Sequence, residues 1–140
     1  MKVLVIGMGA VGCAIAIATA NAGMETAVVA REETAKAIRA NGLKRTGIFD
    51  EITVSSECIT VYENIDQIEV EYDYIAVAVK TMANKTVADE LAKNRNIIGR
   101  NGKIVLFQNG WGNEETYLAY FSASKVFNAR RTVLIGLRKI

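Results

Sequence analysis

Short apolar runs alternate with helical patterns along most of the chain. Residues 3–6 form a β-branched run that ends at Gly7, and residues 10–22 form an alanine-rich helical stretch with Gly23 as a candidate C-cap. Residues 26–30 form a second apolar run of strand length. The segment 31–34 (REET) then opens a helix that ends at Asn41-Gly42. The first 42 residues therefore predict the order strand, helix, strand, helix.

The rest of the chain continues this alternation. Residues 43–61 hold short alternating runs that predict small strands or a hairpin, and residues 64–68 predict a helical turn. Residues 72–79 (YDYIAVAV) and 103–107 (KIVLF) have the composition of strands buried on both faces of a parallel sheet. A helix is predicted over residues 83–93, and another runs from Asn113, as its N-cap, to Tyr120; residues 125–127 and 132–135 are short strand candidates. The pattern predicts an α/β fold with a doubly wound parallel sheet, as one domain over residues 1–140.

Composition fits one soluble domain and narrows the chemistry. The 140 residues are 51% hydrophobic with a formal net charge of +2, which gives no support to nucleic acid or an acidic membrane surface as a partner. The chain has no histidine, so Ser/His/Asp and Cys/His nucleophiles and His-based metal sites are excluded, and we expect no metal. Cys13 and Cys58 lack CxxC spacing, so we expect two reduced, partly buried thiols in a cytoplasmic protein.

Residues 3–24 carry no charged side chain, which raises two alternatives to a strand and helix. A membrane span is disfavoured because the stretch is rich in glycine and alanine, and its glycines have turn spacing. A signal peptide would use Lys2, the apolar run and the small residues 18–20 as a cleavage site. Such cleavage would remove the first strand of the sheet, so we favour the strand and helix and expect no membrane partner.

A glycine motif lies where the first strand meets the first helix. It reads GxGxxG and consists of Gly7, Met8, Gly9, Ala10, Val11 and Gly12. In this context the first glycine allows a tight turn, the second allows close backbone approach to a pyrophosphate, and the third allows close helix packing. The free amides and positive dipole end of the following helix favour phosphate binding. We therefore predict a dinucleotide site here.

The residue at the end of the second strand selects the dinucleotide in this fold. An acid about 20 residues beyond the motif binds the ribose 2′-hydroxyl, whereas an arginine accommodates a 2′-phosphate. Here that position is Arg31, whose guanidinium can bind phosphate through two parallel hydrogen bonds. This indicates NADP(H) rather than NAD(H). The alternative is a solvated Arg31 with Glu32 or Glu33 on the ribose, although both acids also fit the first turn of a helix.

Four segments resemble the N-terminal half of the ketopantoate reductase (2-dehydropantoate 2-reductase) family: KVLVIGMGAVG, AREETAKAIRANGLKRTG, DYIAVAVKT and IVLFQNGWGNEE, which lie between Lys2 and Glu115. The resemblance implies an NADP-binding Rossmann domain of a cytoplasmic oxidoreductase. Its implied activity is the NADPH-dependent reduction of ketopantoate, or a related 2-keto acid, to the 2-hydroxy acid in pantothenate biosynthesis.

The resemblance also implies roles for individual residues. The three motif glycines would shape the pyrophosphate turn, Arg31 would bind the 2′-phosphate and Lys80 would contact the cofactor. Asn109 would lie between the nicotinamide ribose and the substrate, and we expect Trp111 to pack beside this cleft. From the residues alone, Lys80 is equally compatible with a solvated strand end, and Asn109 with a turn.

The resemblance also implies a second, helical domain with a lysine as general acid, and we expect that domain to lie outside these 140 residues. The catalytic residue is therefore unknown, and we expect the chain alone to bind NADPH with little turnover. We leave open whether the chain is a truncated fragment or a complete stand-alone domain, and whether it forms a homodimer.

The first alternative function is that of a stand-alone nucleotide-sensing domain, although such domains normally have an acid where Arg31 stands. The second is a degenerate domain kept for oligomerisation.

Overall fold

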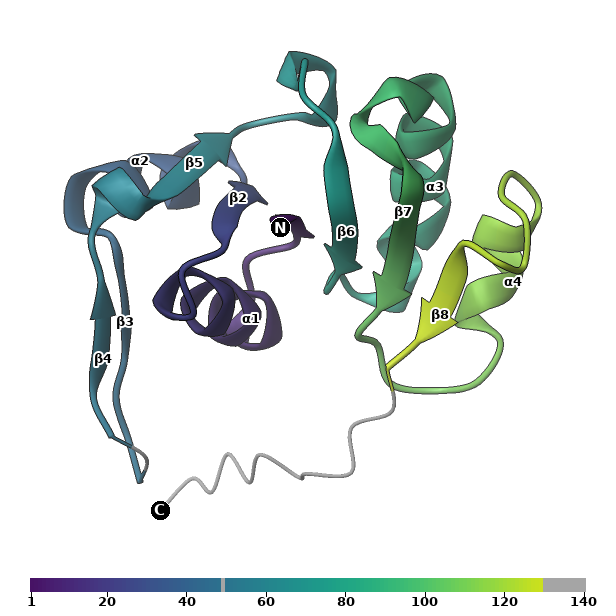
Figure 1. Ribbon diagram of the computed structural model, residues 1–140. Helices are drawn as coiled ribbons and strands as arrows, with labels where there is room; N and C mark the ends of the chain where they lie inside the picture. The colour runs from purple at the N-terminus through teal and green to yellow at the C-terminus, as the bar shows by residue number, and fades with distance from the viewer. Residues whose placement is uncertain (49, 130–140) are drawn as a thin grey trace.

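The computed structural model describes residues 1–48 and 50–129, and it contains the predicted parallel sheet (Figure 1). The sheet has the strand order β5-β2-β1-β6-β7-β8, and every pairing in it is parallel. Counted along the chain, this is the order 3-2-1-4-5-6 of the dinucleotide-binding Rossmann fold. The strands are β1 (Lys2–Ile6), β2 (Glu25–Val29), β5 (Ile59–Tyr62), β6 (Tyr72–Val77), β7 (Ile98–Leu106) and β8 (Val126–Asn128). The predicted fold class is confirmed.

Four α-helices and a separate hairpin complete the described part of the chain. The helices are α1 (Ala10–Asn21), α2 (Glu32–Asn41), α3 (Asn84–Lys93) and α4 (Asn113–Leu118). The hairpin pairs β3 (Leu43–Arg45) with β4 (Ile52–Val54) and contacts α1. Short 3₁₀ turns are η1 (Ser56–Cys58), η2 (Ile65–Gln67), η3 (Thr81–Ala83) and η4 (Arg95–Ile97).

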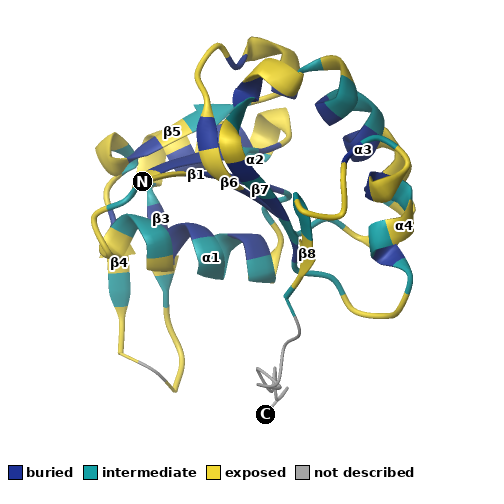
Figure 2. Ribbon diagram, turned by 45° about the vertical axis from the view of Figure 1, so that its right-hand side comes forward, coloured by how far each residue is buried: buried dark blue, intermediate teal, exposed yellow. Residues whose placement is uncertain are grey.

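Alternate side chains of each strand point to opposite faces of the sheet, and helices cover both faces. In β1, Val3 and Val5 belong to the core cluster that contains residues of α1 and α2, whereas Leu4 and Ile6 belong to the cluster that contains α3. Figure 2 shows the dark, buried strands with α1 on one side and α3 on the other. This double cover explains the near-continuous apolar runs of the central strands.

The uncharged stretch at the start of the chain is a buried strand, a turn and a helix. It covers most of β1, the glycine turn, α1 and the loop before β2. Ala16 and Ile17 of α1 are buried against the sheet. Gly23 follows the C-cap residue Ala22 with a φ of +81°, in the left-handed region that favours glycine. Among the described residues, no helix is both long and apolar enough to cross a membrane.

Several local predictions need correction. Asn113 is the first residue of α4 rather than its N-cap; Gly112, with a φ of +80°, precedes the helix instead. The strand predicted at 103–107 begins at Ile98, and the strand predicted to reach residue 79 ends at Val77. Cys13 is half-buried, but Cys58 is exposed, so the expectation of two partly buried thiols is wrong for Cys58. The strand predicted at 132–135 lies outside the described residues.

Candidate functional site

The four candidate site segments are the glycine turn, Arg31, Lys80 and Asn109, and each comes shortly after a residue in one row of paired residues across the sheet. Ile6 of β1 pairs with both Val29 of β2 and Val77 of β6, and Val77 pairs in turn with Leu106 of β7. The glycine turn, Arg31, Lys80 and Asn109 each follow one of these strands within a few residues. Because parallel strands end at the same edge, the four segments share the carboxyl edge of the sheet. Ligands of open α/β sheets bind at this edge.

Backbone hydrogen bonds hold the starts of these segments in register. The amide of Ala78 donates to the carbonyl of Ile6, and the amide of Phe107 donates to the carbonyl of Val77, both over 2.8 Å. The chain order reverses at β1, whose neighbours are β2 on one side and β6 on the other. This reversal is the topological switch point at which a crevice opens between the loops.

The three motif glycines differ in what surrounds them. Gly7 has a φ of +94°, and a Cβ there would lie 2.7 Å from Cγ1 of Val79. A Cβ on Gly12 would overlap the carbonyl oxygen of Gly7. No atom of residues 1–48 or 50–129 would lie within 4 Å of a Cβ on Gly9. The fold therefore requires glycine at the first and third positions, and the second borders open space that a ligand can enter.

The N-terminus of α1 begins at this open space. Gly9 is its N-cap residue, no side chain caps the helix, and its first turn contains no acid. The first backbone bond of the helix runs from the amide of Cys13 to the carbonyl of Gly9. The amides before Cys13 are thus available to an anion, and the helix dipole favours negative charge there.

Two cationic side chains at this edge, Arg31 and Lys80, have no partner among the described residues. Arg31 is the N-cap residue of α2, and Lys80 precedes η3. Neither side chain makes an ion pair or hydrogen bond with the described residues. Glu32, by contrast, forms a 2.8 Å ion pair with Lys36 one turn along α2, and both acids of the helix lie in its first turn. This arrangement favours Arg31 over Glu32 as the ligand-binding group.

A cavity of about 340 Å³ lies beside the loop that contains Asn109. Trp111 is one of the residues that border it, and this residue is 87% exposed. The cavity is lined by Gln108, Asn109, Gly110, Trp111, Glu114, Asn128 and Ala129. These residues come from the carboxyl ends of β7 and β8 and from the start of α4, so the cavity continues the edge at which the four site segments lie.

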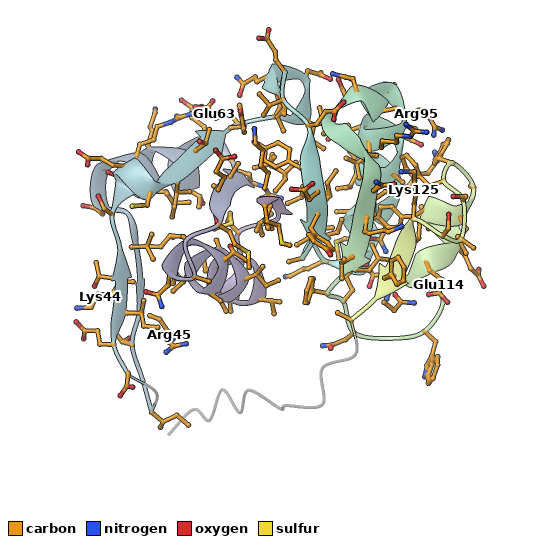
Figure 3. All side chains as sticks on the ribbon, in the orientation of Figure 1. Lys44, Arg45, Glu63, Arg95, Glu114 and Lys125 are labelled. Carbon is orange, nitrogen blue, oxygen red and sulfur yellow. The ribbon has the colours of Figure 1, made fainter. Side chains whose placement is uncertain are left out.

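The sequence interpretation missed Glu114 and Asn128 as residues of this cavity. The Nδ2 of Asn128 donates a 2.9 Å hydrogen bond to Oε2 of Glu114, and Figure 3 shows Glu114 beside β8. This bond, together with a backbone amide, lowers the pKa of Glu114. In the sequence, Glu114 carries only the signal of an acid in the first turn of a helix. The two residues meet because β8 pairs with β7, and no local pattern encodes that pairing.

A second cavity, of about 330 Å³, lies at the opposite edge of the sheet. Lys2, Glu25 and Tyr72, the first residues of three parallel strands, contribute to its lining. None of the proposed cofactor residues borders it. Within the described ranges, no group of three or more His, Cys, Asp and Glu residues is placed to hold a metal ion.

The strand order, the switch point and the glycine turn define a Rossmann-type domain of the class that binds dinucleotides. The family model for ketopantoate reductase PanE/ApbA matches residues 3–139, and the chain belongs to this family.

Curated relatives and a solved structure agree with this membership. The chain is 29% identical over 140 residues to the 2-dehydropantoate 2-reductase of Aquifex aeolicus (strain VF5), covering 100% of this chain and 41% of the relative. It is 30% identical over 120 residues to that of Pyrococcus abyssi (strain GE5 / Orsay), covering 86% of this chain and 37% of the relative. The crystal structure of 2-dehydropantoate 2-reductase from Geobacter metallireducens GS-15 superposes with a TM-score of 0.79 at 26% identity, covering 91% of this chain and 40% of that one. The chain thus spans about two fifths of the length of these relatives.

Proposed function

We propose that residues 1–140 form one domain that supplies the NADP(H)-binding part of a 2-keto acid reductase. The substrate is ketopantoate or a related 2-keto acid, which is reduced to the 2-hydroxy acid in pantothenate biosynthesis. Relatives named 2-dehydropantoate 2-reductase support this reaction class. The observation that carries the proposal is the position of the glycine turn, Arg31, Lys80 and Asn109 beyond one row of residues on four neighbouring strands.

The glycine turn and Arg31 fit the adenine half of NADP(H). The open space at Gly9 and the free amides of α1 suit a pyrophosphate, which needs close backbone approach. The Arg31 guanidinium, without a protein partner in the described part of the chain, suits the 2′-phosphate. A dinucleotide with a 2′-hydroxyl in place of that phosphate would lose two parallel charge-assisted hydrogen bonds and would therefore bind more weakly.

Lys80 and Asn109 are placed to serve the nicotinamide half and the substrate. When bound, NADPH supplies the hydride that passes from its nicotinamide C4 to the keto carbon. Lys80, which pairs with no residue in the described ranges, contributes a positive charge next to the anionic cofactor. The Asn109 amide can both donate and accept hydrogen bonds between the nicotinamide ribose and the substrate. We assign no proton donor to the described residues.

Isothermal titration calorimetry of the purified chain with NADPH and NADH tests this proposal. We expect NADPH to bind at least about tenfold more tightly than NADH, because only NADPH presents the phosphate that Arg31 binds. Equal affinities, or no binding of either dinucleotide, would contradict the cofactor assignment. Tighter binding of NADH or of an adenine nucleotide would favour a nucleotide-sensing domain instead.

A further inference from the structure

Three side-chain amides form a connected chain between α3, α4 and the loop after β7. We call this set the amide chain; it consists of Gln108, Asn84 and Asn113. Asn84 and Asn113 are 4% and 5% exposed, so these polar groups are withdrawn from water. Each is the first residue of its helix, α3 or α4. Burying a side-chain amide costs free energy unless its polar atoms have partners. The hydrogen bonds of these residues therefore offset the cost of their burial and fix their orientation.

The hydrogen bonds of the amide chain start at Gln108, which donates toward both ends. The Nε2 of Gln108 donates to the carbonyl of Val79 over 2.8 Å and to Oδ1 of Asn84 over 2.6 Å. The Nδ2 of Asn84 donates to Oδ1 of Asn113 over 3.1 Å. The Nδ2 of Asn113 then donates to the carbonyl of Asn109 over 3.0 Å. Both ends are backbone carbonyls, which only accept, so the orientation of each amide is fixed.

The two ends of the amide chain adjoin the two proposed nicotinamide-side residues. Val79 immediately precedes Lys80, and the other end is the backbone of Asn109 itself. These residues follow different strands, β6 and β7, and Asn84 is the central link between their loops. Tyr117, which is fully buried, donates a further 3.0 Å hydrogen bond from its hydroxyl to Oδ1 of Asn84. Three amides in series therefore couple the loop of Lys80 to the loop of Asn109.

We propose that Asn84 is a positioning residue that fixes the Asn109 loop relative to Lys80 and thereby sets the affinity of the site for the nicotinamide half of the dinucleotide. This inference rests on the proposed function. Asn84 acts through Asn113 and the backbone of Asn109 and does not touch the ligand. The glycine turn and Arg31 lie beyond β1 and β2, outside the amide chain, so the adenine half is bound independently of Asn84.

Asparagine is required at this position because it both accepts and donates. An aspartate has nearly the same shape, and one of its oxygens still accepts from Gln108 and Tyr117. Its other oxygen faces Oδ1 of Asn113, so two acceptors meet. If Asn113 turned its amide over to donate to the aspartate, its own oxygen would face the carbonyl of Asn109 instead. Either arrangement breaks the link to the Asn109 loop.

The test compares Asn84→Asp with Val87→Ala in the full chain. Position 84 begins α3, where the helix dipole favours an acid and offsets part of the cost of the buried carboxylate. Circular dichroism of each variant verifies its fold before the titrations. Val87 lies on the same helix, is 6% exposed and has no part in the amide chain, so its truncation loosens the core alone. Two probes are titrated into each variant by calorimetry: NADPH, and 2′,5′-ADP, which carries the adenine half without nicotinamide. Hydrogen exchange at Gly110 reports on the loop.

We expect Asn84→Asp to weaken NADPH binding about tenfold, to leave 2′,5′-ADP affinity unchanged and to speed amide exchange at Gly110. Val87→Ala should change neither affinity. Equal losses for both probes in Asn84→Asp, or unchanged NADPH affinity, would overturn the positioning role while the proposed function stands. If the unaltered chain binds neither probe, the proposed function fails, and the positioning role fails with it.

Discussion

Gly12→Ala is expected to destabilise the domain by about 3 kcal/mol or more, the largest effect on stability among these variants. The added Cβ would overlap the carbonyl oxygen of Gly7. That oxygen belongs to the backbone of the turn between β1 and α1, so it cannot move as the end of a flexible side chain can. Relief of the overlap requires α1 to shift away from the sheet, against which Ala16 and Ile17 are buried. Urea unfolding followed by circular dichroism measures the loss.

Gly9→Ala is the matched variant in the same turn. Gly9 has a φ of −78°, which alanine adopts, and a Cβ there would have no atom of the described residues within 4 Å. The free energy of unfolding should therefore change by no more than about 1 kcal/mol, the difference between glycine and alanine at an N-cap. If Gly12→Ala unfolded at the same urea concentration as Gly9→Ala, the packing assigned to Gly12 would be wrong.

Arg31→Ala is expected to lower the affinity for NADPH about hundredfold and to leave the affinity for NADH unchanged. The variant removes two charge-assisted hydrogen bonds to the 2′-phosphate, a group that NADH lacks. Arg31 is exposed at the N-terminus of α2 and its side chain pairs with no described residue, so its truncation should not disturb the fold. Calorimetric titration with both dinucleotides at one fixed ionic strength measures the change, because salt screens exposed charges.

Arg39→Ala provides the control on the same helix. Arg39 already forms a 2.8 Å ion pair with Glu63 and donates to the carbonyl of Val61, so it is committed to the protein. Its loss should change neither dinucleotide affinity. A similar loss of NADPH affinity in both variants would indicate a general effect of positive charge, and Arg31 would not be the specificity residue.

Local patterns were sufficient to predict the architecture. The apolar runs predicted β1, β2 and β6. The acids and glycine around residues 31–42 predicted a helix from Arg31 to Asn41, and α2 begins one residue later, at Glu32. These elements are local: strand composition and helix ends depend on neighbours in the chain. The alternation of strands and helices then leaves few topologies, of which the doubly wound sheet is one.

Long-range contacts explain what the sequence did not predict. The polar segment before Lys103 resembles a turn, yet β7 begins at Ile98 because that residue pairs with Tyr72 across the sheet. Asn113 resembles an N-cap, but its side chain is used by Asn84 and the Asn109 loop, so Gly112 takes the position before the helix. The Glu114–Asn128 contact and the amide chain likewise join segments that only the parallel sheet brings together. The sequence predicted that the four site segments follow neighbouring strands. It did not predict the side-chain contacts that connect the loops after those strands.

Mapping by ¹H–¹⁵N NMR during NADPH titration tests most directly whether the carboxyl edge of the sheet binds the cofactor. The account predicts the largest amide shifts in residues 7–12, at Arg31, at Lys80 and at Asn109. Amides around the cavity at the opposite edge, including Lys2, Glu25 and Tyr72, should remain unchanged. Shifts centred on that opposite cavity, or no shifts at millimolar NADPH, would contradict the account.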